Sequence, residues 1–258
     1  MDFYLGTHLP QWLTWCDVPL FVSRSVLKNR KTFPRAKTRW ALDSGAFSEL
    51  AKFGKWTIPA KEYAGFVERV AGEVGNLEWA APQDWMCEPH MLGKTGMTIL
   101  QHQELTTRNW EELCGLSTSH IIPVLQGWGV GDYARHVEMY DKRGYDLREQ
   151  PVVGLGSVCR RQDTRWAESI VTYLTAQGLK IHAFGFKVTG LKRVAHLLRS
   201  SDSMSWSYAA RCRGHTMEGC SHRAKRCNHC PKWAMDWREA LLLSIRNSCG
   251  GQLPLVAE

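Results

Sequence analysis

Eight short apolar segments, separated by helical patterns, constrain the fold of this chain more than any other feature. Most of them are continuously apolar, which is typical of parallel strands that are covered on both faces. Sequences with helical periodicity lie between several of them, for instance at 59–74 and at 165–178, where a glycine ends the pattern. The eight segments are "DFYLGT", "PLFVS", "RWALDSGAF", "LEWAAPQD", "HIIPVLQG", "PVVGLGSV", "KIHAFGFKV" and "SSDSMSWSY". Alternating β and α units of this number predict an α/β fold, a (β/α)8 TIM-like barrel.

Polar residues follow several of these segments at the point where each strand would end. In such barrels the carboxyl ends of the strands meet at one mouth, and the chemistry gathers there. Any single aspartate in such a place has an ordinary alternative role as a helix N-cap or turn former. The occurrence of polar side chains at four of the strand ends favours a shared site. The candidates at these ends are Asp43, Ser44, Asp84, Gln126, Gly127, Gly154, Leu155, Gly156 and Asp202.

A cluster of metal-ligand residues lies near the end of the chain, before a helix-like pattern that begins at 231. The four candidate ligands are Cys220, His222, Cys227 and Cys230. Four soft or borderline ligands suit a tetrahedral Zn2+, and a closed site of this kind holds structure rather than performing catalysis. Cys212, His215 and His229 are alternative ligands, and unligated thiols in a loop are the alternative to a metal site. We therefore expect a barrel over residues 1–210 and, over 211–258, a zinc-binding loop and a C-terminal helix packed on the barrel.

The charge of the chain indicates a polyanionic partner. With 33 basic and 25 acidic residues the net charge is +8, and nucleic acid is the usual partner of a basic protein. A solvated surface explains a single basic run equally well, but two runs, one beside the cysteines, favour contact with phosphates. The first run contributes Lys28, Arg30, Lys31, Arg35 and Lys37. The second contributes Arg211, Arg213, Arg223, Lys225 and Arg226.

The compartment is predicted from what the sequence does not contain. No apolar run approaches the ~20 residues that cross a bilayer, and the N-terminus has no signal-peptide pattern. Nine cysteines are an odd number and fit reduced thiols plus one metal site better than disulfides. We therefore expect a cytoplasmic protein without a membrane partner. The oligomeric state stays open, a homodimer included.

Taken together, these residues resemble the tRNA-guanine transglycosylase superfamily, and more closely its phage and bacterial branch that inserts 7-deazaguanine bases into DNA. The resemblance runs from "YLGTHLPQWL" to the final tryptophan-rich helix. "LDSGAF" is similar to the superfamily segment Asp-Ser-Gly-Gly-Phe, which implies that Asp43 is a catalytic aspartate beside Ser44 in the base site. "PQDW" resembles the base-recognising segment and points to Asp84. "SSDSMSW" lies where the family carries its nucleophilic aspartate, which implies this role for Asp202.

Two further segments are similar to the base-binding strands of that family. "VLQG" corresponds to its glutamine-glycine segment, Gln126 and Gly127. "VGLGS" corresponds to the strand whose backbone reads the base, from Gly154 to Gly156. The tRNA enzymes carry a Cys-x-Cys-x2-Cys pattern with a distant histidine, whereas here all four ligands are local. This difference and the short chain favour the DNA branch.

The resemblance implies a base exchange. A carboxylate attacks C1′ of the sugar and expels guanine, and a free 7-deazaguanine base then displaces the carboxylate. Asp202 is the expected nucleophile and Asp43 the general acid/base, with the reverse assignment open. In duplex DNA the target guanine must be flipped out of the stack. Asp84 is expected to accept from N1–H and the exocyclic amine, and Gln126 or the backbone at 154–156 to donate to O6.

Three alternatives remain at this stage. Charge does not separate DNA from tRNA, so the same chemistry on tRNA is the nearest one. A non-catalytic zinc protein that only binds nucleic acid explains the charge and the cysteines, but leaves three aspartates without a role. A glycosylase would hydrolyse the bond and stop there.

Overall fold

The structure, a computed structural model, describes residues 1–158, 165–186, 188–220 and 226–248. All eight predicted strand segments contain a strand. The strands are β1 (Asp2–Thr7), β2 (Leu20–Ser23), β3 (Trp40–Asp43), β4 (Leu77–Ala80), β5 (Val124–Leu125), β6 (Val153–Leu155), β7 (Ile181–Ala183) and β8 (Ser200–Ser203).

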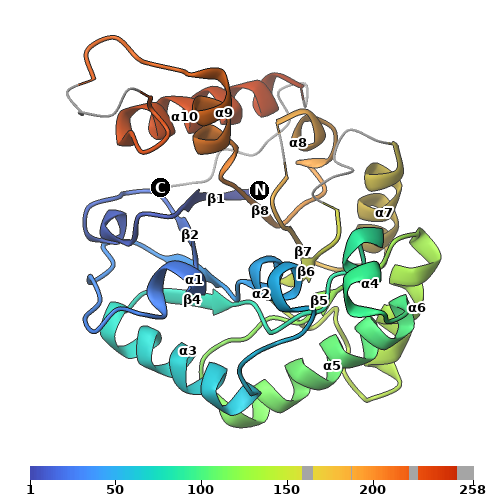
Figure 1. Cartoon of the computed structure of the whole chain (residues 1–258). Coiled ribbons are helices and arrows are strands. Elements are labelled where there is room, and N and C mark those ends of the chain that lie inside the picture. The colour runs from blue at the N-terminus through green and yellow to red at the C-terminus, as the bar shows by residue number, and fades with distance from the viewer. Residues whose placement is uncertain (159–164, 187, 221–225, 249–258) are drawn as a thin grey trace.

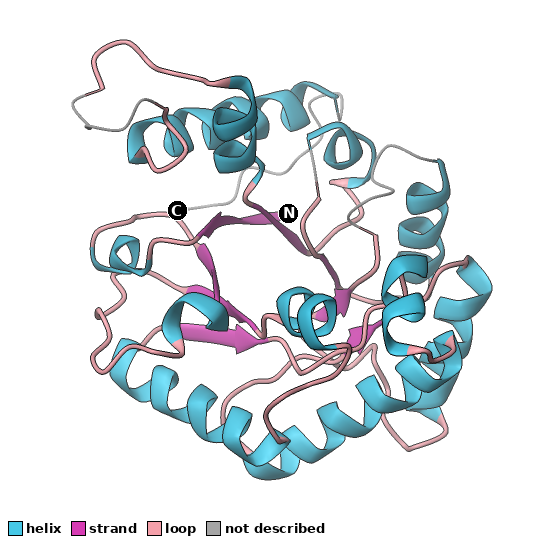
Figure 2. Cartoon of the chain, in the orientation of Figure 1, coloured by secondary structure: helices cyan, strands magenta, loops and turns pink. Residues whose placement is uncertain are grey.

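The eight strands curl into a barrel in which every strand pairing is parallel (Figure 2). Their hydrogen-bonded order is β4-β3-β2-β1-β8-β7-β6-β5. The two ends of this order meet where Ala80 bridges Ile121, just before β5. Two backbone hydrogen bonds make this junction, from Ala80 N to His120 O (2.9 Å) and from Ile122 N to Ala80 O (3.0 Å). The predicted (β/α)8 TIM-like barrel is therefore confirmed.

Helices alternate with the strands and lie outside the ring, except α2, which lies at its opening (Figure 1). The helical patterns at 59–74 and 165–178 are helices α3 and α7, as predicted. The helices are α1 (Arg24–Leu27), α2 (Ala46–Phe53), α3 (Ala60–Val74), α4 (Pro89–Thr95), α5 (Ile99–Leu116), α6 (Val130–Asp141), α7 (Arg165–Ala176), α8 (Val188–Val194), α9 (Ser205–Arg213) and α10 (Pro231–Ser248), with a 3-10 turn at Pro10–Thr14.

The strands are buried on both faces, which explains why their sequences are continuously apolar. Outward-facing side chains such as Leu5, Val22 and Leu155 belong to a large core that they share with the helices. A separate buried cluster fills the interior of the barrel, with Phe21 and Phe184 packed against it. Its members are Tyr4, Ala41, Trp79, Ile122, Val124 and Val152.

All the predicted strand segments except the first are longer than the strands that they contain, and in the third and the eighth a helix begins inside the segment. β3 ends at Asp43 and β8 at Ser203, and helices α2 and α9 begin two or three residues later. Gly45 makes the first turn possible, because its φ of 85° is a left-handed conformation that side-chain-bearing residues disfavour. Its N–H donates to Asp43 Oδ1 at 3.1 Å. The turn thus holds the Asp43 side chain at the end of its strand.

Helices α9 and α10 lie beside β1 and β8 at one side of the barrel (Figure 1). The expected C-terminal helix is α10, which packs on the large core with Leu241 and Ile245 buried and Trp233 and Trp237 half-buried. The boundary expected between residues 210 and 211 falls inside α9. The division into two units stays a prediction.

Gly154 tests the packing of the barrel interior. A Cβ there would lie 2.6 Å from Phe184 Cε2 and 2.8 Å from Val124 Cγ2. We expect Gly154→Ala to lower the free energy of unfolding by about 1–3 kcal/mol through overpacking. Chemical denaturation measures this. Gly65→Ala, in the open middle of α3, is the control and should gain about 0.4–1 kcal/mol; equal effects of both substitutions would contradict the packing argument.

Candidate active site

A cavity of about 250 Å3 opens at the carboxyl ends of the strands. Residues that follow β3, β4, β5, β6 and β7 line it, and the first turn of α2 lies at its entrance. Five of the predicted site residues line the cavity: Asp43, Asp84, Gln126, Gly156 and Asp202. The sequence positions of these residues span most of the barrel, so only the closed ring brings them together. The polar side chains of the lining are Asp43, Asp84, Glu88, Gln126, Ser157 and Asp202.

Asp43 lies at the end of β3, within reach of two hydrogen-bond donors. Burial raises the pKa of its carboxyl group, and the negative charge of Asp202 raises it further. Hydrogen bonds from the Ser23 side chain and from the Gly45 N–H act in the opposite direction. The net increase in pKa favours a protonated Asp43, which is the form that a general acid requires.

Asp202 lies on β8 and is 6% exposed. The N–H of Gly185 donates to its Oδ1 at 2.8 Å, and His182 Nε2 lies 3.4 Å from the same oxygen. The His182 ring is fully buried, and its Nδ1 lies 2.8 Å from Ser200 Oγ. These contacts fix the orientation of the Asp202 carboxyl group at the mouth of the barrel.

A row of hydrogen-bonded side chains forms one wall of the cavity. Gln126 Nε2 donates to Asp84 Oδ2 at 2.5 Å, and Ser157 Oγ donates to Gln126 Oε1 at 2.6 Å. Ser157 Oγ also lies 3.0 Å from Glu88 Oε2. Gly156 leaves room for this row, because a Cβ there would lie 2.6 Å from Gln126 Cδ. The wall therefore runs in the order Asp84, Gln126, Ser157, Glu88.

Asp84 is buried, and this changes its acidity. Loss of solvent raises the pKa of its carboxyl group to about 7, and the nearby Asp43 contributes to the increase. The hydrogen bond from Gln126 opposes it. Asp84 therefore changes its charge close to neutral pH.

The backbone of Gln126 is held from behind by two side chains. Its N–H donates to His136 Nδ1 at 2.9 Å, and its carbonyl oxygen accepts from Gln103 Nε2 at 2.7 Å. Burial lowers the pKa of His136 to about 3, so the ring is neutral and its Nδ1 is an acceptor. His136 Nε2 lies 3.1 Å from Thr107 Oγ1, to which it can donate. Both peptide groups of Gln126 are thus fixed.

Other predicted base-binding residues lie away from the lining. Ser44 is buried, and in the described part of the chain its hydroxyl has no hydrogen-bond partner. Gly154 packs against Phe184 in the barrel, and Gly127 packs against Asp132. Leu155 belongs to the core shared with the helices. Their base-binding roles stay predictions.

Three residues of the site were not predicted: Glu88, Ser157 and His182. Glu88 lies four residues after Asp84 and directly before Pro89, where an acidic residue reads as an ordinary helix start. Ser157 follows the glycine strand as one small polar residue among many. His182 stands in a predicted strand, where a structural histidine is the ordinary reading. Only their positions in space reveal them.

The two predicted basic clusters lie in different places. Lys28 pairs with Glu49 near the mouth (3.7 Å). Arg35 donates to the last carbonyl groups of α3, including Gly72 O at 2.9 Å, and Lys37 pairs with Asp17. The end of α3 precedes the start of β4, so Arg35 and Lys37, unlike Lys28, lie at the opposite end of the barrel from the cavity. The phosphate-binding role of Lys28, Arg30, Lys31, Arg35 and Lys37 stays a prediction.

The second cluster lies nearer to the mouth. Arg211 and Arg213 are on α9, which follows β8 directly, and Arg226 Nη1 donates to Arg211 O at 2.7 Å. Arg223 and Lys225 lie outside the described residues. Of the two clusters, the described part of this one is the better placed to contact a polyanion at the cavity.

Three of the predicted metal ligands lie together. The sulfur atoms of Cys220, Cys227 and Cys230 are within 4.8 Å of one another, and Cys220 Sγ lies 3.4 Å from Cys230 Sγ. Met217 N–H donates to Cys227 Sγ at 3.2 Å, a contact that suits a thiolate. Three converging thiols fit a soft or borderline metal ion. The group could therefore hold a metal, and His222 lies outside the described residues.

The alternative histidine ligands have other contacts. His229 Nδ1 lies 2.7 Å from His8 Nε2, and the His215 ring packs on Trp233 with centroids 4.0 Å apart. Cys212 is exposed on α9. In the described chain, none of the three belongs to the group of sulfur atoms.

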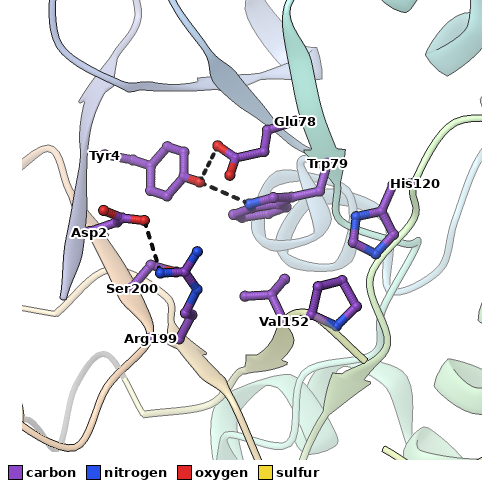
Figure 3. Close-up of a pocket in the computed structure, with 9 residues that line it drawn as sticks. Asp2, Tyr4, Glu78, Trp79, His120, Val152, Arg199 and Ser200 are labelled. Carbon is purple, nitrogen blue, oxygen red and sulfur yellow. Dashed lines mark hydrogen bonds and ion pairs between the residues drawn. The ribbon is translucent and has the colours of Figure 1, made fainter. Parts of the chain in front are cut away.

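A second, smaller cavity lies at the opposite end of the barrel, where the strands begin (Figure 3). Its volume is about 100 Å3. Four of the polar side chains around it pair with one another: Tyr4 donates to Glu78 Oε2 at 2.6 Å, and Arg199 pairs with Asp2 at 3.3 Å. In TIM barrels this end contributes to stability rather than to catalysis. The cavity with the aspartates is therefore the candidate active site.

A comparison with protein families identifies the chain. A family model described as DpdA, DeoxyPurine in DNA protein A, matches residues 1–251. The chain belongs to the DpdA family. DpdA proteins are the DNA 7-deazaguanine transglycosylases related to the tRNA-guanine transglycosylases, so the resemblance found in the sequence is confirmed. The family takes part in the insertion of 7-deazapurines into DNA and implies DNA as the substrate. A search of curated proteins found no match.

Within the described residues of this DpdA family member, no helix combines the length and the apolar character that crossing a bilayer requires.

The raised pKa of Asp84 predicts a pH-dependent loss of stability. The ordinary pKa is 3.8 and the folded value is about 7, so the folded state binds the proton more tightly. The free energy of unfolding therefore falls as the pH rises between these values. Asp84→Asn removes this loss, so the free energy of unfolding of the variant, relative to that of the wild type, should rise by about 2–3 kcal/mol between pH 5 and pH 8. Calorimetric melting measures it.

The exposed carboxyl group of Glu112 provides the matched control. Glu112→Gln should melt in parallel with the wild type over the same pH range. An unchanged difference between wild type and Asp84→Asn across this range would show that Asp84 titrates normally.

Proposed function

We propose that this DpdA family member removes guanine from duplex DNA and inserts a free 7-deazaguanine base at the same sugar, through a covalent aspartyl–sugar intermediate. One observation carries the proposal: the side chains of Asp43, Asp84 and Asp202 line one cavity at the mouth of the barrel. Burying a carboxyl group is costly unless the group is paired or fully hydrogen-bonded. Three such groups in one cavity favour a chemical role over a structural one.

The first step is the attack of Asp202 on C1′ of the deoxyribose. A C1′–O bond forms, the C1′–N9 bond breaks, and its electron pair leaves with guanine. Asp43 gives its proton to the leaving base. The raised pKa of Asp43 and the backbone N–H on Asp202 support this division of roles over the reverse one.

The second step reverses the first with another base. Asp43, now ionised, takes the proton from N9 of the 7-deazaguanine, and N9 attacks C1′. The ester bond breaks and Asp202 regains its charge. Two inversions at C1′ leave the configuration of the sugar unchanged, as in retaining glycosidases.

The wall of Asp84 and Gln126 suits recognition of a guanine edge. Asp84 offers acceptors for N1–H and the exocyclic amine. Gln126 Nε2 has a second hydrogen beyond the one given to Asp84, and it can donate to O6. The target base must leave the DNA stack at a cost of a few kcal/mol. Contacts of Arg211, Arg213 and Arg226 with phosphates would offset this cost.

We further propose that Cys220, His222, Cys227 and Cys230 hold a structural Zn2+. When bound, the metal would supply the ordering free energy that a polar, basic loop lacks. It would thereby hold the basic residues of 211–226 beside the mouth of the barrel.

Asp202→Asn tests the mechanism. We expect it to lower base exchange by about 1,000-fold or more, because the amide cannot form the sugar ester. The assay incubates the protein with duplex DNA or tRNA and 7-cyano-7-deazaguanine, then analyses the digested nucleosides by mass spectrometry. Asp146→Asn, which changes a partly exposed carboxyl group in an ion pair with Arg148, is the control and should retain activity.

The comparison of DNA with tRNA, and the presence or absence of an inserted deazaguanine, distinguish the proposed function from its three alternatives. A deazaguanine nucleoside in DNA alone supports the proposal, and one in tRNA alone would transfer the mechanism to tRNA. Guanine released without any inserted base would indicate a glycosylase. DNA binding without either product would favour a non-catalytic protein.

The metal site has its own test. Cys230→Ser should lower the zinc content of the purified protein, measured by plasma mass spectrometry, and lower its melting temperature. Cys114→Ser, on the exposed face of α5 and away from the cluster, should change neither. Equal zinc contents for the wild type and Cys230→Ser would rule out the proposed site.

A further inference from the structure

The cavity is acidic although the chain is basic. Its lining includes the carboxyl groups of Asp43, Asp84, Glu88 and Asp202. Among the residues that the structure describes, no lysine, arginine or histidine lines it. The chain as a whole carries a net charge of +8. Guanine is neutral, so an exchange of guanine alone does not account for a fourth carboxyl group.

Glu88 is that fourth group, and the mechanism proposed above gives it no role. It is 2% exposed and lies at the N-terminus of α4 without capping the helix through its side chain. In the described part of the chain, the Ser157 hydroxyl is the one hydrogen-bond partner of its carboxyl group. A carboxylate can accept about four hydrogen bonds, and a buried one is costly when they are missing. Glu88 therefore has acceptor capacity for a ligand.

The Ser157 hydroxyl does not donate its hydrogen to Glu88. It lies 2.6 Å from Gln126 Oε1 and 3.0 Å from Glu88 Oε2. A hydroxyl has one hydrogen, and the shorter contact indicates that Gln126 receives it. The oxygen of Ser157 accepts from the Cys87 N–H at 2.7 Å, which leaves it one lone pair, and with this it faces Glu88 as another acceptor. A hydrogen-bond donor placed between the Ser157 oxygen and the Glu88 carboxylate could therefore bind to both.

The order of the wall matches the order of groups around a 7-deazaguanine. Along the edge of that base the exocyclic amine, N1, O6 and the C7 substituent follow one another. Along the wall, Asp84 and Gln126 are followed by Ser157 and Glu88. With Asp84 at N1 and Gln126 at O6, as the proposed function has it, the C7 substituent lies at Ser157 and Glu88.

We propose that Glu88, with Ser157, reads the C7 substituent of the incoming base and selects one that is a cationic hydrogen-bond donor, such as an aminomethyl or amidine group. Such a group supplies both the missing donor and the missing positive charge. A charge-assisted hydrogen bond to a buried carboxylate is about twice as strong as a neutral one. A cyano group offers neither donor nor charge. This inference rests on the base exchange proposed above.

The experiment measures competition between bases during the exchange of labelled guanine into duplex DNA. The competitors are 7-aminomethyl-7-deazaguanine and 7-cyano-7-deazaguanine. For the wild type, the aminomethyl base should inhibit at a concentration about tenfold or more below that of the cyano base. In Glu88→Gln, which has the same shape without the charge, this ratio should fall towards one. Glu88→Asp, which keeps the charge, should retain part of the preference.

The ratio is taken within each variant, so a general loss of activity cancels. Glu112→Gln, at an exposed position, should show the ratio of the wild type. Exchange of labelled guanine without a preference for the aminomethyl base, or a preference that survives in Glu88→Gln, would overturn this inference and leave the base exchange standing. Absence of labelled-guanine exchange in the wild type would instead overturn the proposed function, and the inference with it.

Discussion

The desolvation of carboxyl groups governs the candidate site, and the surrounding backbone is arranged around it. Asp43, Asp84 and Asp202 lie at the mouth of a barrel whose interior is filled with apolar and aromatic side chains. The N–H groups of Gly45 and Gly185 replace part of the lost water at two of them, and the Gln126 amide does so at the third. Where the replacement is incomplete the pKa rises, as for Asp43 and Asp84. The fold thus places two carboxyl groups of raised pKa, Asp43 and Asp84, in the same cavity as Asp202.

A layer of side chains lies behind the wall of Asp84, Gln126, Ser157 and Glu88 and holds it in place. His136 and Gln103 bind both peptide groups of Gln126, and its side chain is held at both ends by Asp84 and Ser157. A recognition group fixed in this way loses little freedom when a ligand binds. This layer lies on α5 and α6, so the helices outside the barrel contribute to the site as well as covering the strands.

Much of the fold and part of the site follow from the sequence pattern. Strands buried on both faces are continuously apolar, and polar residues at their ends must converge once the ring closes, which makes Asp43 and Asp202 predictable. Glu88 and Ser157 are not predictable, because they lie on the loops after the strands, whose paths depend on tertiary packing. The same limit applies to Arg35, which stands in a basic run but donates to the end of α3. Sequence proximity does not show which end of a barrel a loop residue reaches.

The closure of the ring between β4 and β5 has a mechanical consequence. Only a short bridge of backbone hydrogen bonds joins the two strands there, whereas continuous ladders join the other neighbours. Asp84 follows β4 and Gln126 follows β5, so their hydrogen bond spans this seam. A base bound to both side chains, as proposed above, would add a second connection across this short junction. Binding of the base would then stabilise the closed ring, and closure of the ring would in turn favour binding.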